Sequence, residues 1–185
     1  NDVRVQQLIL DWIDNDLIWY VHLGTPCTPY SVARVKRTTG VWVRLSRALL
    51  RFSADVIKLC TKKGVCFTLE NPSTSALFVQ PEMVQALSYP GVRMLEYHLC
   101  RYGCAYKKPS YLATNIPELA CISKLCTCAV KHEVLRGRVC LPCINSKTGR
   151  RWHWETSLAA TYPPLSCRAM AAVLSTPGPA PASPR

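Results

Sequence analysis

The chain alternates short apolar runs with longer amphipathic segments, and this alternation most constrains its fold. Residues 17–23 and 65–69 are apolar runs rich in β-forming side chains, as expected for buried strands. Between them, apolar residues recur at helical spacing over residues 45–60, and Gly64 follows as a C-terminal helix cap. Strands that alternate with helices predict an α/β fold with a parallel sheet covered by helices on both faces.

The same reasoning divides the whole chain into four parts. Helical periodicity predicts further helices over residues 5–13 and 81–87, and residues 92–99 and 111–114 are typical of strands. Periodicity is lost after residue 116, and the last residues are proline-rich. The predicted parts are an α/β core (1–116), an irregular Cys-rich insertion that serves in target recognition (117–155), a segment returning to the core (156–174) and a disordered tail (175–185).

The composition of the chain limits the kinds of partner it can bind and the cellular compartments in which it can work. The 185 residues carry a formal net charge of +12, which favours a polyanionic partner such as nucleic acid. No apolar run reaches the roughly 18 to 20 residues that a membrane-spanning helix needs. Eleven cysteines without a secretion signal indicate reduced thiols in an intracellular protein, nuclear in a eukaryote and cytoplasmic in a phage or bacterial host. Because the chain starts at Asn1, we expect a piece of a longer protein.

Two pairs of residues follow the first two predicted strands. Pro26 and Cys27 come after the first strand, and Glu70 with Asn71 comes after the second. Because α/β sheets place their binding sites at the carboxyl ends of the strands, we expect the two pairs to meet. A cysteine beside a helix start and several cations has a lowered thiol pKa and is reactive. Taken singly, each pair is more typical of a tight turn than of a reactive site.

Four segments in a fixed order resemble a known family. The two pairs above are followed by a Tyr-Gly…Lys-Pro-Ser…Thr-Asn series and by a closing Tyr-Pro-Pro-Leu run, which is similar to the family's (Ile/Tyr)-Pro-Pro-x-Leu segment. Over most of residues 17–173, the order is similar to that of the DNA cytosine-5 methyltransferases of phage or retroelement type. The later matching segments are residues 100–103, 107–110, 113–115 and 158–165.

The resemblance implies a Rossmann-like fold that uses S-adenosylmethionine to methylate carbon 5 of cytosine in DNA, and we expect a monomer. Carbon 5 is a poor nucleophile, so the Cys27 thiolate first adds to carbon 6, which divides one difficult step into two. Glu70 holds or protonates N3 of the base. The target base must leave the duplex stack, which costs about a few kcal/mol. The residues implied to contact the base or DNA are Pro26, Ser31, Arg34, Asn71, Lys107 and Lys108.

Part of the family's cofactor site has no counterpart in this sequence. The Phe-x-Gly-x-Gly turn that cradles the methionine end of the cofactor is absent, as is the acidic residue that holds the ribose. Asp2 is the cofactor-binding candidate, because it matches the acidic residue before the catalytic strand. We therefore expect a partial methyltransferase fold that lacks its first strands. The alternative is a catalytically inactive remnant that still binds DNA.

The Cys-rich insertion offers a second kind of site. Its thiols and one imidazole are enough ligands for a tetrahedral zinc ion, but their spacing follows no standard zinc finger. Scattered reduced cysteines are therefore the favoured interpretation, and a zinc-stabilised interaction module is a third hypothesis. His22, inside an apolar strand, is expected to be a hydrogen-bonded core residue. The zinc candidates are Cys121, Cys126, Cys128, His132, Cys140 and Cys143.

Overall fold

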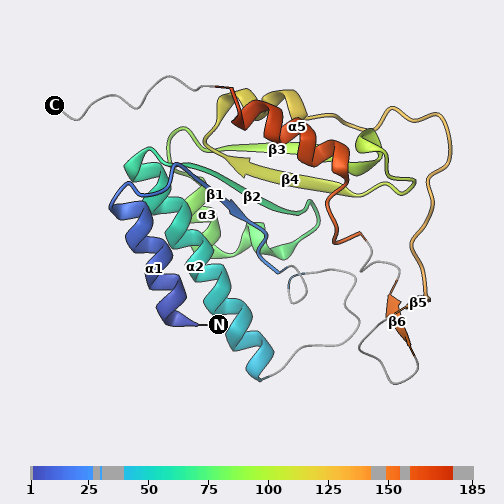
Figure 1. The fold of residues 1–185 in the computed structure, drawn as a ribbon, viewed down its shortest axis with the longest axis horizontal. Coiled ribbons are helices and arrows are strands. Elements are labelled where there is room, and N and C mark those ends of the chain that lie inside the picture. The colour runs from blue at the N-terminus through green and yellow to red at the C-terminus, as the bar shows by residue number, and fades with distance from the viewer. Residues whose placement is uncertain (1, 27–29, 31–39, 143–148, 155–158, 177–185) are drawn as a thin grey trace.

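A four-stranded sheet forms the centre of the protein in the computed structural model, which describes residues 2–26, 30, 40–142, 149–154 and 159–176 (Figure 1). Helices and strands share one fold, so the predicted mixed α/β class is confirmed. That the family's first strands are missing from this sheet stays a prediction. Across the sheet, the strands are β1 (Tyr20–Leu23), β2 (Cys66–Pro72), β4 (Pro109–Thr114) and β3 (Arg93–His98).

The strand directions differ from the all-parallel sheet that the sequence predicts. β1 and β2 are parallel, with Leu23 opposite Leu69, whereas β4 is antiparallel to both β2 and β3. Three strands therefore run one way, with β4 reversed between β2 and β3. The connections explain this. A helix carries the chain from β1 to β2, as a parallel pair requires, but residues 99–108 alone join β3 to β4.

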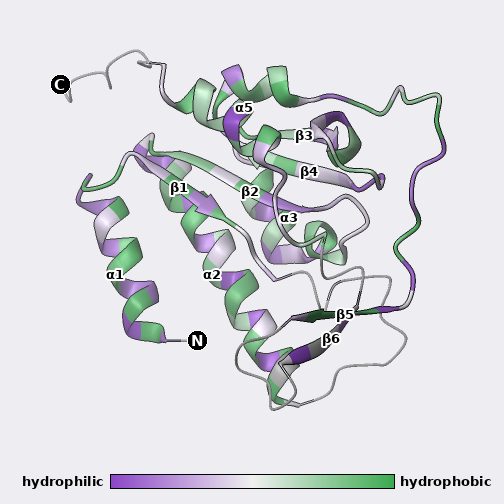
Figure 2. Ribbon diagram, turned by 45° about the vertical axis from the view of Figure 1, so that its right-hand side comes forward, coloured by the Kyte–Doolittle hydropathy of each residue, from purple (hydrophilic) through white to green (hydrophobic). Residues whose placement is uncertain are grey.

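Helices cover the two faces of the sheet (Figures 1 and 2). On one face, α1 (Val3–Asp14), α2 (Val41–Lys63) and α3 (Pro81–Leu87) pack with Phe67 and Leu69 of β2. On the other, α5 (Pro164–Leu174) and the 3-10 turn η4 (Pro117–Ile122) pack with Tyr97 and Leu112. Because strand side chains alternate, β1, β2 and β4 contribute to both cores, whereas the core residues of β3 all face the second.

Two local predictions about the helices are confirmed. Gly64 ends α2 in the left-handed conformation, with a φ of 73°, and its N–H bonds to the carbonyl of Cys60. This conformation is open to glycine at little cost, so the residue stops the helix. α3 has the predicted bounds, and its proline stands at the start, where no backbone donor is needed.

Glu70 and Asn71 lie within a strand, not in the loop that the sequence predicts. β2 continues through Pro72, and Glu70 and Asn71 lie opposite Leu112 and Tyr111 of β4. The expected end of the strand at residue 69 is the last position paired with β1. Pairing with β4 extends the ladder beyond that point, so both side chains are fixed by sheet register.

The segment predicted to be irregular contains a β-hairpin. β5 (Arg138–Pro142) pairs with β6 (Arg150–Trp154) in an antiparallel ribbon apart from the main sheet (Figure 1). Trp152 in this ribbon is 62% exposed. A ribbon that buries little apolar surface shows little apolar periodicity, which explains the error. Two further 3-10 turns are η2 (Ala76–Val79) and η3 (Leu99–Tyr102).

Within the described residues, no helix combines the length and apolar character needed to cross a bilayer.

Candidate functional site

The carboxyl ends of β1 and β2 are tied together by Asn71. Its Nδ2 donates to the carbonyl of Thr25 at 2.7 Å and to the carbonyl of Glu70 at 3.0 Å. Thr25 is also held from α2, because its hydroxyl lies 2.6 Å from that of Ser53. The segment that leads from β1 toward Cys27 is therefore attached to β2 beside Glu70.

Several predicted site residues lie beyond this point. Pro26 is exposed and directly follows the attached Thr25. Cys27, Ser31 and Arg34 lie outside the described residues. Asn71 therefore contacts Thr25, the residue before the first pair, and the meeting of the two pairs themselves stays a prediction.

Glu70 is a buried carboxylate with one oxygen bonded and one open. The residue is 7% exposed, and its Oε2 accepts a hydrogen bond of 3.2 Å from the Tyr162 hydroxyl. Its Oε1 accepts no hydrogen bond from the described residues. Lys108 Nζ lies 3.8 Å from Oε1, and it donates to the carbonyl of Ala159 at 2.9 Å. The ammonium balances the charge of Glu70, and Oε1 is left as a buried acceptor without a hydrogen bond from the described residues.

A chain of hydrogen bonds leads across the sheet to Glu70. Tyr20 and His22 Nδ1 lie 2.6 and 2.8 Å from the Thr68 hydroxyl, and His22 Nε2 lies 3.2 Å from the Tyr162 hydroxyl. Because Tyr162 donates to the Glu70 carboxylate, its oxygen accepts from the His22 Nε2–H. Nδ1 of a neutral His22 then accepts from Thr68, and Thr68 accepts from Tyr20. Every donor in the chain points toward Glu70.

The pKa shifts agree with this direction. Partial desolvation of the His22 ring, whose nitrogens lie against Thr68 and Tyr162, lowers its pKa although the residue as a whole is exposed, and the nearby Glu70 charge acts in the opposite sense. Burial, together with Glu70, raises the pKa of Tyr162 well above its usual value. At neutral pH the imidazole is therefore uncharged and the phenol keeps its proton. The hydrogen bonding predicted for His22 is confirmed, but the residue is exposed and does not lie in a core.

Tyr162 and His22 belong to this site, and sequence reasoning missed both. Tyr162 comes from the closing Tyr-Pro-Pro-Leu run, and a Cβ added to Gly24 would lie 3.4 Å from its hydroxyl. The close approach shows why a small residue suits position 24. His22 lies in β1, two residues before Gly24, so only the register of β1 against β2 identifies its role.

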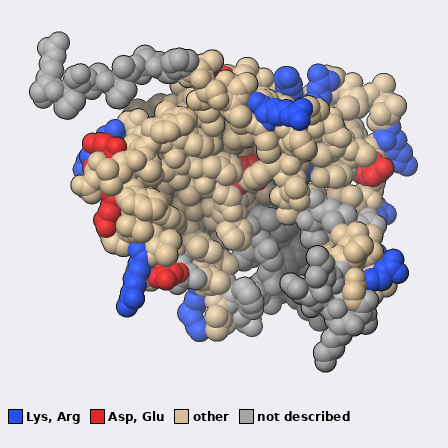
Figure 3. All heavy atoms as spheres, in the orientation of Figure 1, with Lys and Arg blue, Asp and Glu red and all other residues tan. Residues whose placement is uncertain are grey.

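The two predicted DNA-contacting lysines face different surroundings. Lys107 is exposed, whereas Lys108 is half-buried and directed toward Glu70 and Ala159. On the face shown in Figure 3, basic side chains lie at separate places around the periphery and form no single patch among the described residues. Contact of either lysine with DNA stays a prediction.

Asp2, the predicted cofactor contact, serves as the N-cap of α1. Its Oδ1 accepts a hydrogen bond of 2.9 Å from the backbone N–H of Arg4. This end of α1 lies toward the carboxyl end of β1 (Figure 1). A single carboxylate that is already used as a cap does not make a site for S-adenosylmethionine. The described residues therefore do not fit that cofactor by themselves.

A second cluster of reactive side chains lies beyond the end of β3. The ligand atoms of Cys100, Cys126, Cys128 and His132 are all within 4.8 Å of one another. Cys126 Sγ and His132 Nε2 are 3.5 Å apart. Burial, with help from the neighbouring thiols, raises the pKa of Cys100 to about 11, while the backbone N–H of Cys128 lowers the pKa of Cys126. The chain thus forms a Cys3His cluster with metal-binding geometry.

The predicted zinc set is corrected by this geometry. Cys126, Cys128 and His132 meet as proposed, but Cys121 lies in η4 and Cys140 lies in β5, and neither belongs to the cluster. Cys143 lies outside the described residues. The fourth member, Cys100, comes from η3, a segment considered only for its likeness to the Tyr-Gly motif. Ligands that are far apart in sequence have no spacing signal, which is why it was missed.

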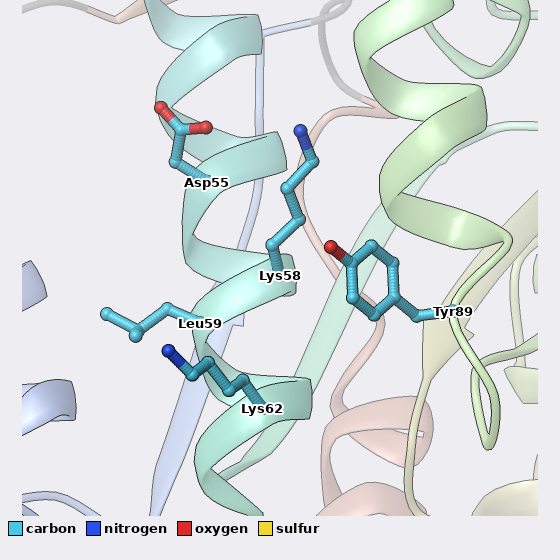
Figure 4. A pocket seen from close by; sticks show the side chains of 5 residues that line it. All are labelled: Asp55, Lys58, Leu59, Lys62 and Tyr89. Atoms are coloured by element: carbon cyan, nitrogen blue, oxygen red, sulfur yellow. The ribbon is translucent and has the colours of Figure 1, made fainter.

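A surface hollow between α2 and the end of α3 is separate from both clusters. It is lined by Asp55, Lys58, Leu59, Lys62 and Tyr89 (Figure 4). Lys58 is engaged there, because its Nζ donates to Gln85 Oε1 at 2.8 Å. α2 covers the face of the sheet opposite to the Glu70 side chain, so the hollow does not communicate with the Glu70 site.

No family model, curated protein or solved structure matches the chain. Function is therefore argued from the side chains of the site, since a fold alone does not imply an activity.

Proposed function

We propose that this chain is the base-facing, catalytic part of a DNA cytosine-5 methyltransferase, with Cys27 as the nucleophile and Glu70 as the acid. The observation that carries the proposal is the 2.7 Å bond from Asn71 to the Thr25 carbonyl, two residues before Cys27. It supports a nucleophile and a carboxyl group that act on one base from neighbouring strand ends.

The open oxygen of Glu70 supports a ligand with N–H groups. A buried acceptor left without a hydrogen bond costs about 1–3 kcal/mol, and a ligand that donates to it recovers this cost. The amino group of cytosine is such a donor, and N3 accepts a proton from a protonated carboxyl group. Tyr162 donates to Oε2 and the Lys108 ammonium lies 3.8 Å from Oε1, so the carboxyl group keeps one orientation.

The proposed chemistry is addition to the pyrimidine ring. The Cys27 thiolate forms a bond to carbon 6, and the carbon 5–carbon 6 π pair moves to the carbon 4–carbon 5 bond. Glu70 first takes up a proton from water when the base binds, and the carbon 4–nitrogen 3 π pair takes that proton at N3, which leaves an enamine that is nucleophilic at carbon 5. Glu70 is left as the carboxylate, to which Tyr162 donates. The described residues carry the reaction no further.

S-adenosylmethionine supplies the methyl group in the family that the chain resembles. DNA is the proposed macromolecular partner, and the net charge of +12 supports it, because cations displace the counterions of phosphate. The exposed Lys107 is the described residue proposed to lie near the backbone of the flipped nucleotide. We propose that the protein acts as a monomer.

The test uses DNA that traps the thiol before methyl transfer. A random-sequence duplex pool with pyrimidin-2-one in place of cytosine presents a ring that is more electrophilic at carbon 6. The full chain should form a covalent complex that survives denaturing electrophoresis, and mass spectrometry of peptides should locate it at Cys27. Cys27→Ser should abolish the complex, while Cys121→Ser, which alters an exposed thiol away from the site, should retain it.

Two outcomes would contradict the proposal in different ways. A covalent complex at another cysteine would remove Cys27 as the nucleophile. Intact binding to the same duplex by fluorescence anisotropy, without any covalent complex, would favour the inactive DNA-binding remnant. Calorimetry with S-adenosylmethionine should be run beside these assays, because heat of binding would show that the full chain holds the methyl donor.

A further inference from the structure

We propose that Cys100, Cys126, Cys128 and His132 bind one structural zinc ion. Three thiolates and one imidazole are the ligands of closed tetrahedral zinc sites, with metal–ligand distances of about 2.0–2.3 Å. Ligand atoms within 4.8 Å of one another can surround such an ion with small side-chain adjustments. Soft thiolates select zinc over the hard cations that prefer oxygen.

The ligand set points to a structural role for the metal. Catalytic zinc keeps one position open for water or substrate, whereas four protein ligands close the coordination sphere. In this cluster all four positions are filled by the protein. The ion therefore serves to hold chain segments together, and this role is independent of the proposed methyltransferase activity.

Backbone hydrogen bonds position the loop that carries Cys126, Cys128 and His132. The N–H of Cys126 donates to His98 Nδ1 at 2.8 Å, and the N–H of His98 donates to the carbonyl of Lys124 at 3.0 Å. After the last ligand, the N–H of Glu133 donates to the carbonyl of Ala105 at 3.0 Å. The loop is thus fixed on both sides of the ligands, as a preformed site requires.

Zinc at this position would connect the loop to the turn that follows β3. Cys100 lies in η3, and the N–H of Leu99, the first residue of η3, donates to the carbonyl of Lys108 at 3.1 Å. Lys108 in turn faces Glu70 across 3.8 Å. The metal would therefore stabilise the segment between β3 and β4, which includes Lys107 and Lys108 and lies next to the proposed base site.

Metal content of the full chain tests the proposal. Protein purified under reducing conditions should contain about one zinc ion per molecule, measured by inductively coupled plasma mass spectrometry. Cys100→Ser should weaken zinc binding by about 100-fold or more, since losing even a supporting contact costs 10–100-fold. Cys121→Ser and Cys140→Ser remove thiols of the same Cys-rich region that lie outside the cluster, and both should keep the zinc.

Cobalt substitution separates loss of a ligand from loss of folding. His132→Cys keeps four ligands, so it should retain one metal ion and show a stronger thiolate-to-cobalt absorption than the original chain. Zinc lost from Cys121→Ser or Cys140→Ser but kept in Cys100→Ser would overturn the proposal. So would a cobalt complex without thiolate absorption, or a disulfide between two of the three cysteines in freshly purified protein.

Discussion

The Glu70 site and the Cys3His cluster bring distant residues together by different means. At the Glu70 site, sheet register fixes the partners, because Thr68 and Glu70 project from β2 beside His22 of β1. At the cluster, three of the four ligands lie in a segment without helices or strands, held by a few backbone hydrogen bonds. Paired strands present Glu70, Thr68 and His22, although Tyr162 and Lys108 reach Glu70 from outside helices and strands, whereas the cluster lies mostly on a loop.

This difference predicts how each site behaves without its ligand. A network on paired strands keeps its geometry, because ladder hydrogen bonds hold the backbone whatever occupies the site. A loop with three thiols and an imidazole lacks such support, so a bound ion contributes to its order. Substitutions at the Glu70 site should change chemistry more than structure, and those around the cluster should change metal binding and local order.

The largest expected effect is that of Glu70→Gln. The amide has the shape of the carboxyl group but does not transfer a proton to N3, so the covalent complex with pyrimidin-2-one DNA should form about 10²–10⁴-fold more slowly. The rate would be followed by quenching samples in denaturant over time.

Zinc content serves as the control for Glu70→Gln, since the cluster is a separate site and should keep its metal. An unchanged rate of complex formation would show that Glu70 is not the acid. A simultaneous loss of zinc would show that the Glu70 site and the Cys3His cluster are not independent, so the two could not be treated as separate sites.

His98→Phe should give the next largest effect. His98 does not belong to the cluster, but its Nδ1 accepts from the backbone N–H of Cys126 and so orients that ligand. Loss of such a supporting contact should weaken zinc binding by about 10–100-fold, measured by competition with a coloured chelator. Tryptic cleavage after Lys124 or Lys131 should increase with it. Unchanged affinity would show that the loop is ordered by its other contacts alone.

Asn71→Ala should lower the free energy of unfolding by about 1–3 kcal/mol, because the buried carbonyl of Thr25 loses its donor. It should also slow complex formation, since the segment leading to Cys27 is released from β2. Asn115→Ala is the matched control. Asn115 bonds to the backbone of Phe67 and Val65 at the other end of β2, so its loss should lower stability in urea without slowing the reaction of the folded protein.

Equal slowing in both variants would show that general loosening of β2, and not release of the Thr25 segment, controls the rate. No slowing in either variant would show that the position of Thr25 does not matter to the reaction.

The sequence predicted individual helices and strands more accurately than the pairing and direction of the strands in the sheet. α3 and the Gly64 cap depend on local chemistry, a proline start and a left-handed glycine, which a single segment contains. The reversal of β4 depends on the connection from β3 and on pairing across the sheet, which no periodicity reveals. In α2, the buried residues include the small Ala54, which hydrophobicity alone does not single out.

The same limit applies to the two sites. Glu70 was found because it stands next to a strand in a pair with Asn71, and three zinc ligands were found because they are close in sequence. Tyr162 and Cys100 were missed because each reaches its site from a distant part of the chain. A short motif identifies the residues that one strand or loop presents, but the residues that complete the site come from tertiary structure.

The smallest expected effect concerns pH and His22. Burial lowers the pKa of His22 in the folded protein below the value of about 6.5 expected when unfolded. The unfolded chain therefore binds more protons between these two values, so the free energy of unfolding should fall as pH drops below about 6.5. His22→Gln keeps a donor for Tyr162 and an acceptor for Thr68, and it should remove this part of the pH dependence in urea titrations.

In Glu70→Gln the nearby negative charge is lost, so NMR titration should find the pKa of His22 lower still. A pKa of His22 above 6.5, or one unaffected by Glu70→Gln, would contradict the hydrogen-bond chain with an uncharged His22. The Glu70 site would then have no evidence of greater order than the loop of the Cys3His cluster.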